Sequence, residues 1–280
     1  MKKIAIQGFL GSYHDIAAHE YFSGEEISLI CCSTFEEIFQ HIEKDSSVIG
    51  MLAIENTIAG SLLHNNELLK ESNTKIVGEH KLRIAHCLTC LPEDDMEDIK
   101  EINSHPIALM QCRDFLQKNP KVRVVECEDT ALSAELIQKN KLRGHAAICS
   151  ERAAEINGMK ILERGIETNK HNFTRFLIVE AKEKIDNTKP LANKSSLVLT
   201  LPHETGSLSP VLSILSYYKM DLTKIQSLPI IGREWEYQFY IDITYQSYQG
   251  YQLAIEAIKP LMRDFKILGE YTECKNLKPC

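Results

Sequence analysis

The sequence has 280 residues, which is long enough for two domains and at least one sizeable core. A formal net charge of −7 argues against a nucleic-acid partner, and no apolar run approaches the length of a membrane span. The basic and then apolar start, residues 1–8, is too short for a signal peptide and is typical of a first β-strand. We therefore expect a cytoplasmic protein without a membrane partner.

Short apolar runs alternate with helix-like patterns over the first 180 residues. The strands expected are 3–7, 27–32, 48–54, a stretch within 75–91, 122–127 and 146–149, and the helices are 14–22, one opened by a Ser33–Glu36 capping box, 61–71, 107–116, 130–139 and 150–156. This βαβα rhythm predicts a mostly parallel α/β sheet with helices on its faces. Ligands of such sheets bind beyond the carboxyl ends of the strands.

The pattern changes after residue 181. Residues 182–194 are polar and contain a proline, which is typical of a linker. The elements expected beyond the linker are strands at 195–201, 222–228, 236–244 and 265–271, and helices at 207–218 and 251–262. Their order, βαββαβ, predicts a separate ferredoxin-like domain.

The nine cysteines are scattered through apolar segments, and we expect them to be reduced and buried. Cys87 and Cys90 form a CxxC that could be a redox pair or half of a metal site. They lie in a strand-like run without a second CxxC, and a redox pair needs a helix N-terminus to lower the thiol pKa, so neither function is favoured. The ten histidines show no metal-ligand spacing, and no metal site is predicted.

Three segments place polar groups where a strand gives way to a helix. The turn Gly8–Tyr13 could present backbone N–H groups to an anion, or be a plain tight turn. Asn56 follows an apolar strand and could grip a carboxylate or form an Asx turn. Ser104 is placed as the N-cap of a helix, and Gln111 on that helix could simply face solvent.

Thr174, Arg175 and Phe176 stand where an apolar strand begins. The hydroxyl can donate or accept a proton and the guanidinium can bind a carboxylate in a bidentate manner. These abilities suit an enzyme that holds an anionic acid and protonates a leaving hydroxyl. Alone, the tripeptide is more typical of a β-forming residue beside a solvated charge.

Taken together, these segments resemble prephenate dehydratase. The similar segments, in chain order, are Gly8-x-x-Gly11-Ser12-Tyr13, Glu55-Asn56-Thr57-x-x-Gly60-Ser61, Ser104-His105-Pro106 with Gln111-Cys112, Ala146-Ala147-Ile148 and Asn172-x-Thr174-Arg175-Phe176. They follow the family's order and cover nearly the whole chain. The domain that follows resembles an ACT regulatory domain, as in the bacterial enzyme without a fused chorismate mutase.

The resemblance implies a catalytic region, residues 1–181, with a two-lobed fold of the type 2 periplasmic-binding-protein class. One lobe would comprise residues 1–78 and 156–181, and the other residues 79–155. A linker at 182–194 and an ACT domain at 195–280 would follow.

The family reaction would convert prephenate to phenylpyruvate in phenylalanine biosynthesis, with no metal or organic cofactor. Thr174 would act on the leaving hydroxyl by a positioned hydrogen bond or a relay. Asn56, Ser104 and Gln111 would orient the substrate, and Phe176 would contribute to the same site. Arg175 would hold a carboxylate or brace the cleft.

The effector segments depart in part from the family pattern. They read Gly206-Ser207-Leu208-Ser209 and Gln226-Ser227-Leu228-Pro229, with Gln226 and Leu228 where the family has Glu and Arg. We expect phenylalanine to remain an effector, the alternative being a domain that only dimerises, and we expect a homodimer or homotetramer. The alternatives for the whole chain are arogenate dehydratase, whose substrate has an amine in place of the keto group, and a non-enzymatic amino-acid-responsive binding module.

Overall fold

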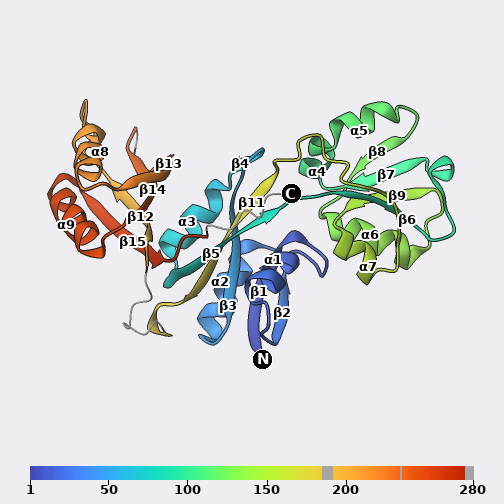
Figure 1. The fold of residues 1–280 in the computed structure, drawn as a ribbon, viewed down its shortest axis with the longest axis horizontal. Helices are drawn as coiled ribbons and strands as arrows, with labels where there is room; N and C mark the ends of the chain where they lie inside the picture. The colour runs from blue at the N-terminus through green and yellow to red at the C-terminus, as the bar shows by residue number, and fades with distance from the viewer. Residues whose placement is uncertain (185–191, 234, 275–280) are drawn as a thin grey trace. The chain divides into compact units, whose positions relative to one another are not determined.

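The computed structural model describes residues 1–184, 192–233 and 235–274, and the chain divides into two compact units (Figure 1). The first unit comprises residues 1–41, 50–62 and 80–176, and the second comprises 42–49, 63–79 and 177–280. Within the described ranges, no helix has the length and apolar character needed to cross a membrane. Most of the predicted linker, residues 185–191, lies outside the described residues.

The first sheet of the first unit forms what we call the N-terminal lobe. Its strands are β1 (Lys2–Gln7), β2 (Ile27–Cys32), β3 (Ile49–Asn56), β4 (Gly60–Ser61) and the start of β11 (Phe173–Ala181), and its helices are α1 (Tyr13–Tyr21) and α2 (Phe35–Lys44). β1 pairs in parallel with β2 and lies between β2 and β3, as the βα rhythm predicts. The six residues of β3 from Ile49 to Ile54 are all buried, which explains why this strand is apolar without alternation.

The second sheet, which forms the inserted lobe, has the order β10-β6-β9-β7-β8. Its strands are β6 (Cys87–Cys90), β7 (Glu101–Ser104), β8 (Arg123–Glu126), β9 (His145–Cys149) and β10 (Lys160–Arg164), and its helices are α4 (Pro106–Gln111), α5 (Arg113–Lys118), α6 (Thr130–Asn140) and α7 (Glu151–Ile156), with a 3₁₀ turn at Met96–Asp98. β7 pairs in parallel with β8 and β9, but β6 pairs antiparallel with β9 and β10. The sheet of this lobe, predicted to be mostly parallel, is therefore mixed. β5 (Thr74–Arg83), which precedes β6 in the chain, belongs to the other sheet.

Successive residues of β9 point into two different cores. Ala146 and Ile148 pack with the α4–α5 side, whereas Ala147 and Cys149 pack with α6 and α7. This alternation is the period of two expected of a strand covered on both faces. The two cores fix the positions of α4 and α6, whose starts face the candidate site.

Three local predictions were wrong in detail. The helix expected at 107–116 is two short helices that meet at Cys112. The N-cap of α4 is His105 rather than Ser104, because the helix begins at Pro106 and its cap is the preceding residue. The Ser33 N–H donates to Glu37 Oε2 at 2.7 Å, one residue beyond the Glu36 of the predicted capping box.

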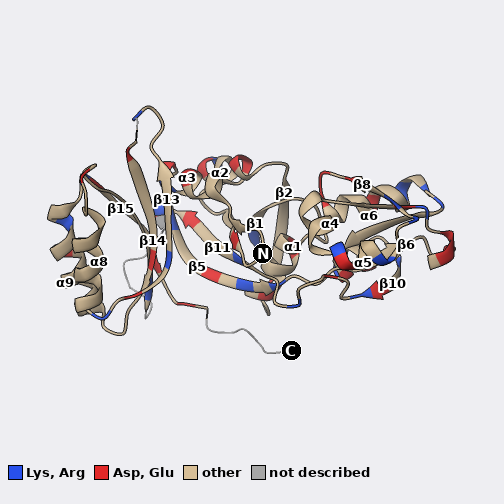
Figure 2. Ribbon diagram, turned by 90° about the horizontal axis from the view of Figure 1, so that it is seen from above, with Lys and Arg blue, Asp and Glu red and all other residues tan. Residues whose placement is uncertain are grey.

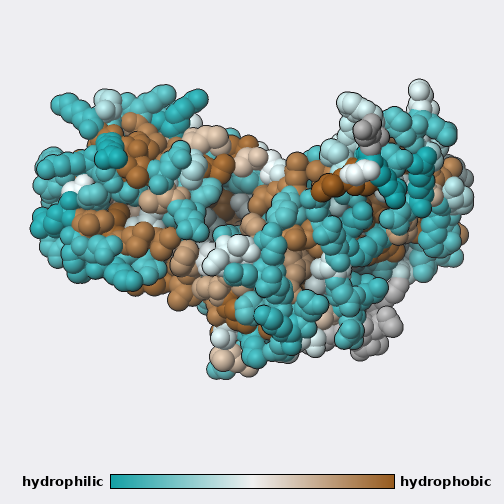
Figure 3. All heavy atoms as spheres, turned by 180° about the vertical axis from the view of Figure 1, so that it is seen from behind, coloured by the Kyte–Doolittle hydropathy of each residue, from teal (hydrophilic) through white to brown (hydrophobic). Residues whose placement is uncertain are grey.

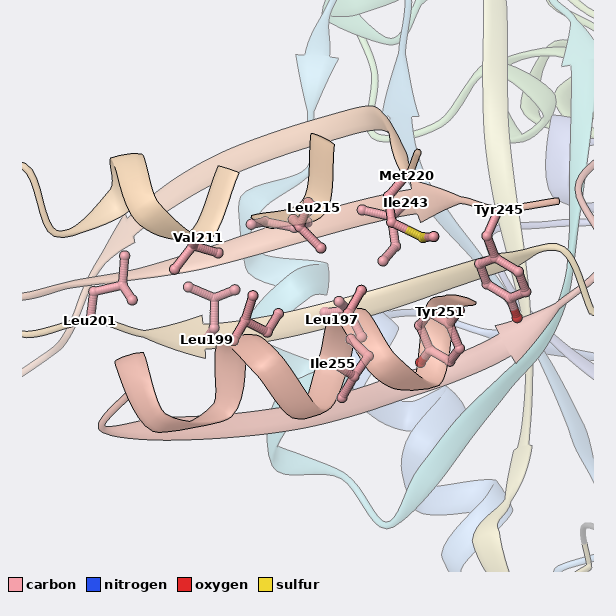
Figure 4. Packing of buried hydrophobic residues seen from close by; sticks show 13 residues of the cluster. Leu197, Leu199, Leu201, Val211, Leu215, Met220, Ile243, Tyr245, Tyr251 and Ile255 are labelled. Carbon is pink, nitrogen blue, oxygen red and sulfur yellow. The ribbon is translucent and has the colours of Figure 1, made fainter. Parts of the chain in front are cut away.

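The second unit contains the predicted βαββαβ order. Its elements are β12 (Lys194–Thr200), α8 (Leu208–Tyr217), β13 (Asp221–Pro229), β14 (Tyr237–Thr244), α9 (Tyr248–Ile258), a 3₁₀ turn at Lys259–Leu261 and β15 (Asp264–Tyr271). Its strands pair antiparallel in the order β13-β14-β12-β15, so β13 is an edge strand. Figure 4 shows the apolar core between this sheet and the two helices, with Leu197, Val211, Ile243 and Ile255 at its centre.

This sheet continues from β15 into β5, next to β11, and α3 (Leu63–Glu71) and a 3₁₀ turn at Lys182–Lys184 belong to the same unit. β15 pairs with β5 in parallel through Gly269 and Ile76. A Cβ atom at position 269 would lie 2.2 Å from the Ile76 carbonyl oxygen, so only glycine permits this approach.

The surface carries both signs of charge among scattered apolar residues. Lys and Arg residues and Asp and Glu residues are spread over the ribbon in Figure 2. Hydrophilic residues cover most of the face seen in Figure 3, with small hydrophobic patches between them. Single exposed apolar residues of this kind are normal for a globular protein.

Candidate active site

A cavity of about 390 Å³ lies between the two lobes of the first unit. Its lining, from β1 to β11, is Gln7, Ser12, Tyr13, His14, Ala53, Asn56, Ala59, Gly60, Ser61, Leu62, Ile84, His86, His105, Ile107, Ala108, Gln111, Glu128, Asp129, Thr130, Thr174 and Phe176. Neither lysine nor arginine is among these described residues. The cavity therefore offers neutral hydrogen-bonding groups to a ligand rather than cations.

Asn56 and Thr174 meet in this cavity across β3 and β11. Asn56 Nδ2 donates to Thr174 Oγ1 at 3.0 Å, and Asn56 Oδ1 accepts from the N–H groups of Ile58 and Ala59 at 2.9 and 2.8 Å. The predicted Asx turn is present, since one end of the amide accepts from these N–H groups, and the other end donates to the threonine. Among the described residues the Thr174 hydroxyl has no acceptor, so its own proton is available to a ligand.

Gln111 is the last residue of α4, and its buried side chain contacts His86 and Asn172. Neither of these was predicted as a site residue. Gln111 Oε1 lies 2.9 Å from His86 Nε2 and accepts from Asn172 Nδ2 at 2.9 Å. His86 Nδ1 lies 2.7 Å from the Tyr13 hydroxyl, and Asn172 Oδ1 accepts from Asn56 Nδ2 at 2.8 Å. The alternative that Gln111 faces solvent is wrong, since only 6% of it is exposed.

A continuous polar chain therefore runs from Tyr13 through His86, Gln111, Asn172 and Asn56 to Thr174. Asn172 could have been found from the sequence, because it lies two residues before Thr174 and shares its face of the strand. Nothing in the sequence indicates His86 as a site residue, because it lies in an apolar run directly before the CxxC.

Phe176 and His14 form the apolar wall of the cavity. Phe176 is buried, and its ring meets the His14 ring edge to face with centroids 4.9 Å apart. His14 Nε2 faces the Ala53 N–H at 3.4 Å. Burial lowers the pKa of His14 from 6.5 to about 4, so this ring is neutral at pH 7.

We expect stability to fall in mild acid because of this histidine. An unfolded chain binds a proton at His14 below pH 6.5, whereas the folded chain does so only below about pH 4. The contribution of His14 to the free energy of unfolding is therefore fully present above pH 6.5. It declines by about 1.4 kcal/mol per pH unit between pH 6.5 and pH 4. Burial also lowers the pKa of His86, which adds in the same direction. Urea unfolding at pH 7 and pH 4.5 measures the decline.

The variant His14→Gln should show a shallower decline than the parent chain. His80→Leu is the control, because His80 pairs with Glu20 outside the cavity. A parent chain equally stable at both pH values would contradict the assignment of His14 as a buried neutral group.

Arg175 and Ser104 lie outside the cavity lining. Arg175 is on the opposite face of β11 from Thr174, and its Nη1 donates to Glu55 Oε1 at 3.0 Å. Ser104 is fully buried, and its hydroxyl donates to the Ile148 carbonyl at 2.6 Å. Arg175 thus links β11 to β3, which favours a bracing role over contact with a substrate carboxylate. Ser104 links β7 to β9.

The Gly8–Tyr13 turn contacts the inserted lobe rather than presenting a free anion cradle. The Gly11 N–H donates to Asp15 Oδ2 at 2.7 Å, and the Gly11 carbonyl accepts from Ser150 Oγ at 2.5 Å. A Cβ at Gly11, whose φ is +86°, would lie 2.6 Å from Ala153 Cα. Close packing thus requires glycine at position 11, and the Gly11 N–H is already bonded to the Asp15 carboxylate.

Two carboxylates line the cavity at the start of α6. Asp129 caps this helix, accepting from the N–H groups of Ala131 and Leu132 at 2.7 and 3.0 Å. Burial raises the pKa of Asp129. With the neighbouring Glu128, it makes this end of the cavity acidic.

The described cysteines are reduced, and no group of histidine, cysteine and acidic residues within the described ranges could hold a metal ion. Cys87 and Cys90 are buried in β6, and burial raises the pKa of both thiols, that of Cys90 to about 11. A thiol with a raised pKa is rarely ionised at pH 7, which opposes redox and metal-binding roles for Cys87 and Cys90.

The predicted effector segments both belong to the second unit. Gly206 has a φ of +83°, which favours glycine at the turn that leads into Ser207, Leu208 and Ser209 at the start of α8. Residues 226–229 end the edge strand β13. Gln226 donates to the Ser227 carbonyl at 3.0 Å, and Leu228 is buried.

Comparison with known proteins agrees with this architecture. The model of the family described as prephenate dehydratase matches residues 4–184. The bifunctional chorismate mutase/prephenate dehydratase of Buchnera aphidicola (subsp. Acyrthosiphon pisum) is 37% identical over 264 residues, covering 93% of this chain and 68% of that protein. The chloroplastic arogenate dehydratase/prephenate dehydratase 6 of Arabidopsis thaliana is 34% identical over 285 residues, covering 96% and 68%.

Two solved structures share the fold over nearly the whole chain. GqqA, named as a novel type of quorum-quenching acylase, has a TM-score of 0.87 at 28% identity and covers 98% of both chains. The prephenate dehydratase of Arthrobacter aurescens in complex with L-Phe has a TM-score of 0.86 at 23% identity, covering 97% of this chain and 90% of that one.

Fold and site together define a class of protein, namely two-lobed α/β enzymes of the type 2 periplasmic-binding-protein fold followed by a small βαββαβ domain. Within this class the family is clear. The chain belongs to the prephenate dehydratase family of hydro-lyases.

Proposed function

We propose that the cavity converts prephenate to phenylpyruvate and that Thr174 assists departure of the ring hydroxyl. The C1–carboxylate bond breaks and releases carbon dioxide, while its electron pair enters the ring. The C4–O bond breaks with its electron pair on oxygen, and one proton completes water. Because aromatisation drives the reaction, the enzyme mainly has to stabilise the departing oxygen.

The observation that carries this proposal is the direction of the Asn56–Thr174 hydrogen bond. An amide N–H can only donate, so Thr174 Oγ1 accepts from Asn56 and keeps its own proton for the cavity. A free hydroxyl is a weak acid, so Thr174 acts as a positioned hydrogen-bond donor, with solvent restoring the proton consumed.

The substrate has two carboxylates, and the cavity supplies neutral donors for them. Gln111, whose NH₂ group has no partner among the described residues, orients the substrate, whereas Asn56 positions the Thr174 hydroxyl. Phe176 and His14 provide an apolar wall for the ring. We place the catalytic domain at 1–181 and the regulatory domain at 195–280, after a linker at 182–194. Of the expected lobes, 1–78 plus 156–181 and 79–155, the second also takes in β10 (Lys160–Arg164), because this strand pairs with β6.

The regulatory domain is proposed to bind L-phenylalanine. The βαββαβ fold, the Gly206 turn and the end of β13 supply the elements of an effector site, and the Arthrobacter aurescens relative was solved with L-Phe. The exposed edge strand β13 offers a surface for pairing with a second copy, which supports a homodimer or homotetramer. A biosynthetic role supports a cytoplasmic location.

Arogenate is a second candidate substrate. Glu128 and Asp129 line the cavity, and carboxylates would attract the ammonium that arogenate carries in place of the keto group.

Turnover of prephenate by the purified protein, followed as phenylpyruvate absorbance, tests these proposals. Arogenate is assayed in parallel, and each assay is run with and without L-phenylalanine. We expect prephenate turnover that phenylalanine suppresses. Turnover without suppression would reject the effector site alone. A higher kcat/KM for arogenate would assign the second substrate, and no turnover of either would return the chain to the binding-module alternative.

A further inference from the structure

We infer that His86 is a positioning residue, which holds the Gln111 amide so that its NH₂ group faces the cavity as a donor to an anionic group of the substrate. Tyr13 selects the ring tautomer that this task requires. The identity of the ligand rests on the proposed function. The His86 tautomer and the orientation of the Gln111 amide do not depend on turnover.

The orientation of the amides is set by backbone groups at one end of the polar chain. The N–H groups of Ile58 and Ala59 can only donate, so the atom of Asn56 that faces them is its oxygen. Asn56 Nδ2 then faces Asn172 and identifies the facing atom there as oxygen.

The same logic continues to the histidine. Asn172 Nδ2 donates to Gln111, whose facing atom is therefore Oε1. His86 Nε2 lies 2.9 Å from this oxygen, which can only accept, so Nε2 carries a proton.

The opposite ring nitrogen of His86 then has to accept. The ring is 1% exposed, and burial lowers its pKa, so it carries a single proton, on Nε2. The Glu167 carboxylate, which accepts from the His86 backbone N–H at 3.0 Å, is itself paired with Arg83 and Lys170. Nδ1 accordingly accepts from the Tyr13 hydroxyl at 2.7 Å, in preference to the Ala85 carbonyl 2.9 Å from the same oxygen.

Gln111 Oε1 accepts from His86 and Asn172, so the NH₂ group of the same amide points away from both residues. Its two N–H groups have no partner among the described residues, and Gln111 lines the cavity. A carboxylate or keto oxygen is the group that such a donor binds. If His86 could not donate, Asn172 Nδ2 alone would hold Oε1, and the NH₂ group would be aimed at the cavity less firmly.

Three variants separate positioning from general support of the fold. His86→Leu removes the donor, and we expect KM for prephenate to rise about 10- to 100-fold, the range for a lost hydrogen bond to a charged group, with kcat changed less. His86→Gln restores an N–H near the position of Nε2 and should recover most of the lost affinity. His80→Leu, at a histidine outside the cavity, should leave KM unchanged.

Nitrogen NMR of the histidine rings in the ligand-free protein tests the tautomer without any assay of activity. The His86 signals are assigned by their loss in His86→Gln. We expect a protonated Nε2 and an unprotonated Nδ1 at pH 7, and loss of the hydrogen-bond shift at Nδ1 in Tyr13→Phe.

A proton on Nδ1 would overturn the inference, as would an unchanged KM in a folded His86→Leu variant or the same KM in the leucine and glutamine variants. If the parent protein turns over neither prephenate nor arogenate, the proposed function fails, while the ring signals still decide the tautomer.

Discussion

Replacement of Thr174 by valine is expected to lower kcat for prephenate by about 10²- to 10³-fold, the usual cost of losing one donor to a developing oxyanion. Valine has nearly the shape of threonine but no hydroxyl, so the lobe should fold normally. The departing oxygen then loses its donor, and Asn56 Nδ2 loses one of its acceptors. Single-turnover kinetics with saturating prephenate measure the effect on the chemical step.

Two further variants give this experiment its controls. Thr174→Ser keeps the hydroxyl and should retain most of kcat. Thr57→Val makes the same chemical change nearby, at a hydroxyl that donates to the His171 carbonyl outside the cavity, and should leave kcat within a few-fold. A folded Thr174→Val enzyme with near-normal kcat would remove Thr174 from the mechanism.

Replacement of Lys194 by methionine is expected to destabilise the second unit by about 3–5 kcal/mol, because it removes the cation of a buried ion pair. Lys194 Nζ lies 3.1 and 3.0 Å from the two Glu79 oxygens, and the side chains are 3% and 0% exposed. The loss corresponds to a fall of roughly 10 °C in the thermal unfolding midpoint. Differential scanning calorimetry provides the measurement.

The double variant Glu79→Leu/Lys194→Met should be more stable than Lys194→Met alone, since it removes the buried carboxylate as well as the lysine. Lys259→Met is the matched control. Lys259 pairs with Glu256 on the surface, where such pairs contribute about 1 kcal/mol or less. If Lys194→Met melts like Lys259→Met, the buried pair does not stabilise the fold.

Local patterns predicted most elements because each carried its own periodicity. β2 was predicted with its observed bounds, and the βαββαβ order was confirmed. The failures were long-range effects. The antiparallel pairing of β6 with β9 joins segments far apart in sequence, and at the break between α4 and α5 the Gln111 carbonyl accepts from the distant Thr168 N–H at 2.8 Å. The pairing of Gly269 with Ile76 joins residues far apart in sequence.

The site was predictable where polar residues followed strand ends. Asn56, Gln111, Thr174 and Phe176 all line one cavity, although their roles remain predictions. Arg175 shows the limit, because adjacent residues of a strand face opposite sides and a motif does not say which side is the cavity. His86 could not be found from sequence, since its role depends on Gln111, 25 residues away.

The absence of lysine and arginine from the described cavity lining has a consequence for ionic strength. An enzyme that clamps a dianion between cations loses affinity as salt screens their attraction, over a distance of about 10 Å at 0.1 M. Here the donors are amides and a hydroxyl, and the nearby charges are the carboxylates of Glu128 and Asp129. Added salt should therefore leave substrate affinity unchanged or improve it.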